Sequence, residues 1–192
     1  MENKIHAAIF CSPHNPCGRV WEQWEIERVM ELYKKYDVMV ISDEIWSDII
    51  TTGHKHIPTQ SVSEDAKMRT IALYAPSKTF NLAGLVGSYH IIYNKMLKDR
   101  VDKEASLSHY NSMNVLSMYA LIGAYKPEGY EWVDELCQVI TGNVVHAYGI
   151  HVCFVGDAVL HVRSNLLLVA CQFLLQQGVL FQLFGLQQYA EV

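Results

Sequence analysis

The order of short apolar runs and turns constrains this chain most, because it is the order of an α/β fold. Residues 5–11 form an apolar run that ends in a Pro- and Asn-rich turn, and residues 38–42 and 70–74 form two more such runs. Continuous apolar runs of this length are typical of strands buried on both faces of a parallel sheet. An amphipathic helix is predicted between the first two, over residues 21–36. The order predicts an α/β domain with a mostly parallel sheet.

The pattern becomes helical after one more predicted strand at residues 86–93. Amphipathic or apolar stretches predict helices over residues 94–105, 108–125 and 128–140. Gly142 follows the last of these, and a glycine just past a periodic segment predicts the end of a helix.

The composition changes after Gly142. Residues 143–192 hold only Asp157, Arg163 and Glu191 as charged residues. We therefore predict two parts, a domain over residues 1–142 and an atypical apolar tail over residues 143–192.

An uncharged stretch dominates this tail, from Leu166 to Leu186, and it is long enough to span a bilayer as a helix. Four glutamines interrupt it, and an amide buried in hydrocarbon is costly. A buried or oligomer-facing helix is therefore favoured over a membrane span. A tail foreign to the domain, as a frameshift or alternative splice would produce, is favoured over both.

Composition and charge exclude several classes of protein. The chain is 51% hydrophobic and 18% charged, as soluble globular proteins are, and its net charge of −5 comes without a basic cluster for nucleic acid. The five cysteines are an odd number and form no C-x-x-C pair, which argues against a disulfide framework or zinc ribbon and favours the cytoplasm. The first residues are a poor match to a signal peptide. His54 and His56 lie in a polar segment without a third ligand at suitable spacing, so a surface loop is predicted there and not a metal site.

Polar segments follow three of the predicted strands, where ligands bind in open α/β sheets. The first, S-P-H-N-P-C-G-R, contains Asn15, whose amide could bond a cofactor oxygen. An ordinary strand-to-helix turn is the alternative interpretation of this segment.

The second segment, S-D-E-I-W-S-D, places Asp43 directly after a buried strand. A carboxylate in such a position needs a positive partner, and a protonated pyridine nitrogen is one. A helix N-cap is an equally good interpretation of Asp43. Glu44 and Asp48 are interpreted as solvated or structural.

The third segment, A-P-S-K-T-F-N-L-A-G-L, places Lys78 among small, apolar and hydroxyl residues. Desolvation of a lysine favours its neutral amine, the form that makes a Schiff base. The alternative is a lysine in a surface loop, but the flanking string is more specific than the lysine alone.

Together, N-P-x-G-R, D-E-I-W-x-D-I and A-P-S-K-T-F-N-x-A-G-L resemble the fold-type I pyridoxal-phosphate (PLP) enzymes of the class I/II aminotransferase superfamily. The segments P-H-N-P, G-R-V-W and G-H-K-H-I-P are most similar to its branch of cystathionine β-lyases and cysteine C–S lyases. The resemblance covers about residues 5–141 and implies the large PLP-binding domain in part.

The resemblance implies a role for each matched residue. Lys78 would carry the cofactor, Asp43 would pair with the pyridine nitrogen, and Asn15 would bond the ring oxygen. Trp46 stands where relatives place Tyr or His near that oxygen, so its indole N–H would be the donor. Ser77 would lie near the phosphate.

The sequence also departs from the pattern that the resemblance implies. Val86 stands where many relatives carry a phosphate-binding arginine, and Arg163 in the tail matches no family pattern. The small-residue phosphate loop, the aromatic residue that stacks on the ring and the arginine for the substrate carboxylate have no counterpart here.

The implied activity is β-elimination at the C–S bond of cystathionine, cysteine or a related sulfur amino acid, giving pyruvate, ammonia and a thiol. Transamination would use the same residues and is the first alternative. The second is a catalytically silent fragment that acts only by association. Relatives form homodimers, so a homodimer is expected.

Overall fold

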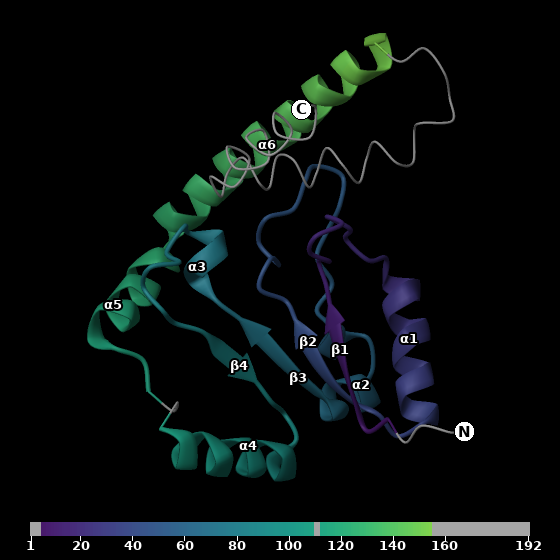
Figure 1. The fold of residues 1–192 in the computed structure, drawn as a ribbon, viewed down its shortest axis with the longest axis vertical. Coiled ribbons are helices and arrows are strands. Elements are labelled where there is room, and N and C mark those ends of the chain that lie inside the picture. The colour runs from purple at the N-terminus through teal and green to yellow at the C-terminus, as the bar shows by residue number, and fades with distance from the viewer. Residues whose placement is uncertain (1–4, 110–111, 155–192) are drawn as a thin grey trace, which may run out of the picture. The chain divides into compact units, whose positions relative to one another are not determined.

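The computed structural model describes residues 5–109 and 112–154 of the chain. Its strands are β1 (Ala7–Cys11), β2 (Met39–Asp43), β3 (Thr70–Tyr74) and β4 (Tyr89–Ile91). Its helices are α1 (Gln23–Lys35), α2 (Glu64–Arg69), α3 (Pro76–Thr79), α4 (Lys95–Ser108), α5 (Val115–Ala124) and α6 (Pro127–Phe154), and a 3-10 turn, η1, spans Thr59–Ser61 (Figure 1).

The described strands form one sheet in the order β1-β2-β3-β4, as Figure 1 shows. β1, β2 and β3 run parallel, and β4 pairs antiparallel with β3. The predicted α/β class with a mostly parallel sheet is thereby confirmed. In the register, Asp43 lies beside Cys11 on one side and Leu73 on the other, so β1, β2 and β3 end at the same edge.

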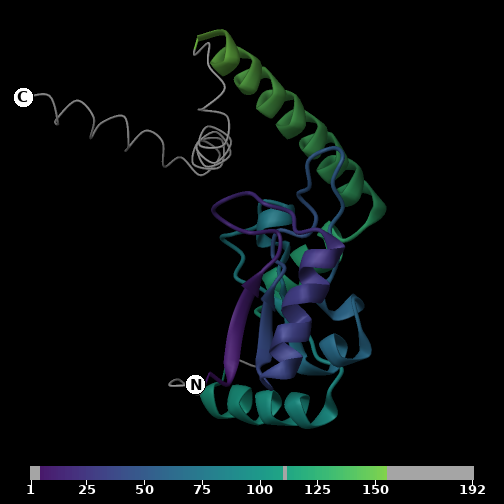
Figure 2. The ribbon, with the colours of Figure 1, turned by 90° about the vertical axis from the view of Figure 1, so that its right-hand side faces the viewer.

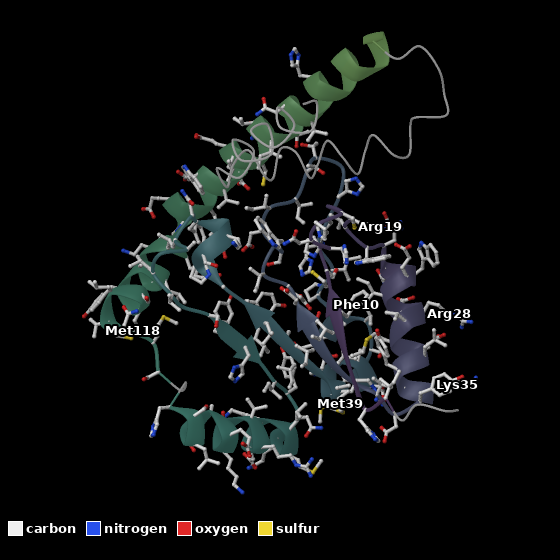
Figure 3. All side chains as sticks on the ribbon, in the orientation of Figure 1. Phe10, Arg19, Arg28, Lys35, Met39 and Met118 are labelled. Atoms are coloured by element: carbon white, nitrogen blue, oxygen red, sulfur yellow. The ribbon has the colours of Figure 1, made fainter. Side chains whose placement is uncertain are left out.

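Helix α1 lies along one face of this sheet and supplies much of the core (Figure 2). A capping box starts the helix: Glu22 and Glu25 each accept a bond from the other's backbone N–H. Ile26 and Met30 are fully buried one turn apart and pack with Val40 of β2. The polar side of the helix faces away, as its labelled Arg28 and Lys35 show (Figure 3).

The opposite face of the sheet is only partly covered in the described chain. Along β2, Val40 and Ser42 are buried, whereas the alternating residues Met39 and Ile41 are half-buried. On edge strand β1, Ile9 is 75% exposed. The prediction that the run at residues 38–42 is buried on both faces is therefore wrong for this chain. The reason is that both helices of the core cluster, α1 and α2, cover the same face.

Several helix ends differ from the sequence-based expectation. Helix α6 continues through Gly142 to Phe154, because that glycine does not take the positive φ that ends a helix. Helix α5 begins only after Asn114, whose side chain accepts the N–H of Ser117 as an N-cap. Strand β4 is three residues long, shorter than predicted.

One compact unit runs to Cys137, without residues 16–18, and contains the whole sheet. A second unit takes in residues 16–18 and the chain from Gln138 onward. The predicted boundary at residue 142 stays a prediction, and the predictions about residues 155–192 concern a segment outside the described residues. In the part of the chain that is described, no helix combines the length and apolar character needed to cross a membrane.

Candidate functional site

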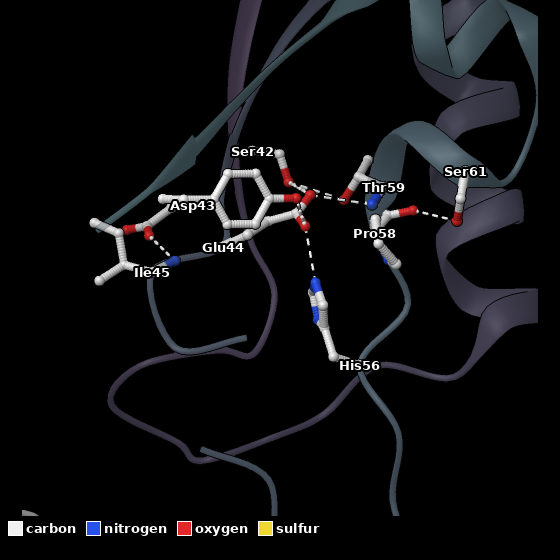
Figure 4. Close-up of polar contacts among 9 residues, drawn as sticks. Ser42, Asp43, Glu44, Ile45, His56, Pro58, Thr59 and Ser61 are labelled. Carbon is white, nitrogen blue, oxygen red and sulfur yellow. Dashed lines mark hydrogen bonds and ion pairs between the residues drawn. The ribbon is translucent and has the colours of Figure 1, made fainter. Parts of the chain in front are cut away.

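Asp43 is the last residue of β2, at the edge where the three parallel strands end. Its side chain is half-buried, and the backbone N–H of Ile45 donates to its Oδ1 at 3.2 Å. Figure 4 shows this turn directly after the strand. The bond holds one carboxylate oxygen in place, while no hydrogen bond within the described residues engages the other.

Lys78 lies in α3, the single helical turn that follows β3. Pro76 occupies the first turn, where its missing N–H costs no hydrogen bond, and the N–H of Phe80 closes the turn on the Pro76 carbonyl at 3.0 Å. The Lys78 side chain is half-buried, and its Nζ lies 5.6 Å from the ring centroid of Trp46. At this separation the ring attracts the ammonium group by a cation–π interaction.

Trp46 reaches Lys78 because the chain turns back after β2. The N–H groups of Ser47 and Ile49 bond the carbonyls of Glu44 and Trp46, at 3.0 and 3.1 Å. The contact found for Trp46 is therefore with the lysine amine. Its predicted bond to a cofactor oxygen stays a prediction.

Asn15 and Ser77 occupy the same edge of the sheet. Asn15 is exposed in the turn after β1, which the bond from the His14 N–H to the Arg19 carbonyl closes at 2.7 Å. Ser77 is half-buried in α3, and its carbonyl accepts the N–H of Leu82. All five predicted site residues thus lie at or after the ends of β1, β2 or β3. Of these residues, the structure joins Trp46 to Lys78, and within the described chain no ion pair joins Asp43 to Lys78.

Glu44 is fully buried, so the interpretation that it is solvated is wrong and the interpretation that it is structural stands. Its Oε1 accepts from the hydroxyl of Ser42 at 2.8 Å and from the N–H of Thr59 at 3.0 Å. Its Oε2 lies 2.6 Å from the Tyr74 hydroxyl and 2.8 Å from Nε2 of His56. His56 is therefore not the surface-loop residue that its polar neighbours suggested.

These bonds keep the Glu44 carboxylate charged. Burial raises the pKa of Glu44, but the hydrogen bonds from His56, Tyr74 and Ser42 outweigh burial, and the net pKa lies below its ordinary value. Burial and the nearby Glu44 charge raise the pKa of Tyr74, so its hydroxyl stays a donor. The cluster ties the end of β2 to the end of β3.

Sequence reasoning missed a second tie between the same two segments. The hydroxyl of Thr79, which is fully buried, donates to Oδ2 of Asp48 at 2.9 Å. The signal was the hydroxyl residue beside Lys78 in S-K-T, but nothing in the sequence indicated its partner 31 positions away.

The chain matches a family of known proteins over most of its length. The model of the family "Aminotransferase class I and II" matches residues 2–145. Cystathionine β-lyase PatB of Bacillus subtilis is 37% identical over 139 residues, which are 72% of this chain and 36% of that protein. Protein MalY of Escherichia coli is 34% identical over 139 residues, 72% of this chain and 35% of that protein.

Solved structures agree with these sequence matches. Cystalysin from Treponema denticola, which contains a pyridoxal 5'-phosphate cofactor, superposes with a TM-score of 0.68 at 39% identity. The match covers 74% of this chain and 36% of cystalysin. The PLP-bound C–S lyase of Staphylococcus hominis gives 0.69 at 33% identity, over 77% of this chain and 36% of that one. The chain spans about a third of the length of the relatives it matches, and it belongs to the aminotransferase class I and II family.

Proposed function

We propose that this chain carries the central part of a PLP-dependent carbon–sulfur β-lyase. The observation that supports it most is the placement of Asp43 at the end of β2 and of Lys78 just after β3, two neighbouring parallel strands that end at one edge. Similarity to PatB, to MalY and to the C–S lyase of Staphylococcus hominis favours the lyase reaction within the family.

The described residues fit PLP chemically. Lys78 offers an amine that pairs with no carboxylate in the described part of the chain, and Asp43 offers an oxygen without a hydrogen bond there. Lys78 would hold the aldehyde carbon and Asp43 the pyridine nitrogen. Asn15 and Trp46 would serve the ring oxygen and Ser77 the phosphate. When bound, PLP supplies an electron sink that stabilises negative charge at the substrate Cα.

The chain's own residues would then divide the work. The Lys78 amine takes the proton from the substrate Cα as general base. The Asp43 carboxylate, held by the Ile45 N–H, keeps a proton on the pyridine nitrogen by charge attraction. The Trp46 ring stabilises the ammonium form that Lys78 adopts after it accepts the proton. Loss of a thiol from Cβ and addition of water leave pyruvate and ammonia.

A direct assay tests this proposal. With PLP and cystathionine, the full chain should release pyruvate, and Lys78→Ala should abolish the release because no other residue replaces the amine. Lys55→Ala, which changes an exposed lysine, serves as the matched control and should retain the activity. Normal pyruvate release by Lys78→Ala would refute the assignment.

Transamination is the second candidate, because the relatives include an aspartate aminotransferase of Bacillus, 29% identical over 125 residues. Pyridoxamine phosphate formed from an amino acid, without pyruvate, would favour this reaction. Failure to bind PLP at all would favour the third candidate, a silent fragment acting by association. Its basis is the short span relative to the relatives.

Three further expectations belong to the same proposal. The substrate is a small sulfur amino acid, and the intact protein is a homodimer in the cytoplasm. The resemblance to dimeric enzymes supports the dimer, and the odd number of cysteines without a C-x-x-C pair agrees with a reducing compartment. Sedimentation of the purified chain tests the dimer.

A further inference from the structure

The segment after β2 contacts the end of β3 and the segment that follows β3 at three successive places. The Tyr74 hydroxyl bonds Glu44, Lys78 lies over the ring of Trp46, and Thr79 bonds Asp48. The three contacts come from positions 44, 46 and 48 of the first segment.

The lysine segment needs such contacts to hold its shape. Helix α3 has only four residues, and a single turn is not stable alone because nucleation is costly. Phe80 at its end packs edge-on against Tyr125 and Tyr130, with ring centroids 5.0 and 5.9 Å apart. The rings of Tyr125 and Tyr130 restrain the C-terminal end of α3 through Phe80, but these ring contacts do not involve Lys78 itself.

The bond between Thr79 and Asp48 supplies that restraint. Thr79 is fully buried next to Lys78, and Asp48 is itself held, because the Cys137 thiol donates to its backbone carbonyl at 3.6 Å. Burial, followed by the charge of Asp48, raises the pKa of Tyr130, which places this carboxylate near the same aromatic group. A hydrogen bond from a hydroxyl to a carboxylate is directional and stronger than one between two neutral groups.

We propose that Asp48 is a positioning residue: through the Thr79 hydroxyl it holds α3 so that the Lys78 amine stays against Trp46 at the sheet edge that carries Asp43. The geometric claim stands on the contacts above. Its consequence for PLP capture by Lys78 rests on the proposed function.

The test compares two near-isosteric changes at one buried position. Thr79→Ser keeps the hydroxyl, whereas Thr79→Val keeps the branched shape and removes the donor. Asp48→Ala removes the acceptor, and Thr79→Val combined with Asp48→Ala completes a double-mutant cycle. Far-UV circular dichroism of each full-length variant verifies that it folds before labelling.

The first measurement does not depend on PLP. Formaldehyde and cyanoborohydride methylate the lysine amines, and peptide mass spectrometry measures the rate at each lysine. The measured quantity is the methylation rate of Lys78 divided by that of exposed Lys55. Thr79→Ser should keep the wild-type ratio. Thr79→Val and Asp48→Ala should each raise the ratio about fivefold, as loss of a typical hydrogen bond allows, because Lys78 leaves the Trp46 ring more often. The double variant should match the single ones, because both remove the same bond.

The second measurement uses PLP fixed on Lys78 by borohydride in the same variants. An unchanged methylation ratio in folded Thr79→Val and Asp48→Ala would overturn the positioning role, whether or not PLP is fixed. Equal loss of restraint in Thr79→Ser and Thr79→Val would also overturn it, since the hydroxyl would then not be the cause. If the methylation ratios follow the prediction but borohydride fixes no PLP on Lys78 of the wild type, the proposed cofactor role is rejected. Asp48 would then still be a positioning residue.

Discussion

Glu44 shows how one residue can stabilise the site without facing it. The residue before it, Asp43, presents its carboxylate at the strand end, whereas Glu44 turns into the protein and accepts four hydrogen bonds (Figure 4). A buried carboxylate is tolerated only when its oxygens are bonded in this way. The cost of losing these bonds is therefore large for a single residue.

Glu44→Gln should lower the free energy of unfolding by about 2 kcal/mol, because hydrogen bonds to a charged acceptor are lost and an amide donor faces other donors. Urea unfolding followed by circular dichroism measures the change at about pH 7. Glu22→Gln, which changes an exposed carboxylate at the start of α1, is the control and should cost less. An equal loss in both variants would contradict the account of the buried cluster.

The free energy of unfolding should depend on pH in the way that the titration of Glu44 predicts. The pKa of Glu44 is lowered from 4.5 in the folded state. Its contribution is therefore fully present above about pH 4.5 and is lost as the pH falls through the folded value. The gap in unfolding free energy between wild type and Glu44→Gln should narrow as the pH falls from about 5 through the folded-state pKa of Glu44. A constant gap over this range would count against a charged Glu44.

At the scale of the element, the helical period of α1 determines which of its side chains are buried. Ile26 and Met30 are four residues apart and face the sheet, whereas Trp24, two residues before Ile26, is 66% exposed despite its size. Side-chain direction, and not hydrophobicity alone, therefore determines which residues of this helix stabilise the fold.

Ile26→Ala should lower the free energy of unfolding by about 2–5 kcal/mol, because it leaves a cavity in the packed core. Trp24→Ala removes a larger side chain from the same helix, yet it should cost less than about 0.5 kcal/mol because the ring is mostly in solvent. Urea midpoints of the two variants provide the comparison. A larger loss for Trp24→Ala would show that the exposed face of α1 is covered in solution.

At the scale of the molecule, the sheet has one sealed face and one open face in the described chain. Parallel sheets in this fold class are covered on both faces. The chain, at about a third of the length of its relatives, leaves Ile9 exposed and the odd-numbered side chains of β2 half-buried. Stability should therefore be distributed unequally across the sheet.

Substitution by threonine on the two faces tests this asymmetry. Val40→Thr places a hydroxyl in the sealed core and should cost about 1–3 kcal/mol. Ile9→Thr makes the same kind of change on the open face and should cost less than about 0.5 kcal/mol. Equal losses in urea unfolding would mean that the open face is covered in the protein as it exists in solution.

The local sequence pattern was sufficient to predict the order of the strands and helices and the residues that lie at the strand ends. Apolar period and turn residues act over a few positions, so β1, α1, β2 and β3 are readable from the sequence, as is the placement of Asp43 and Lys78 after neighbouring strands. The parallel direction follows as well, because a helix connects the first two strands.

Contacts between residues about 30 positions apart depend on strand register and on how each turn redirects the chain. No local pattern contains that information, so the bonds from Tyr74 to Glu44 and from Thr79 to Asp48, and the Trp46 ring beside Lys78, had to come from the folded arrangement. The same holds for the open face of the sheet. Burial depends on which elements lie above a strand, whereas an apolar run reports only that a strand can be buried.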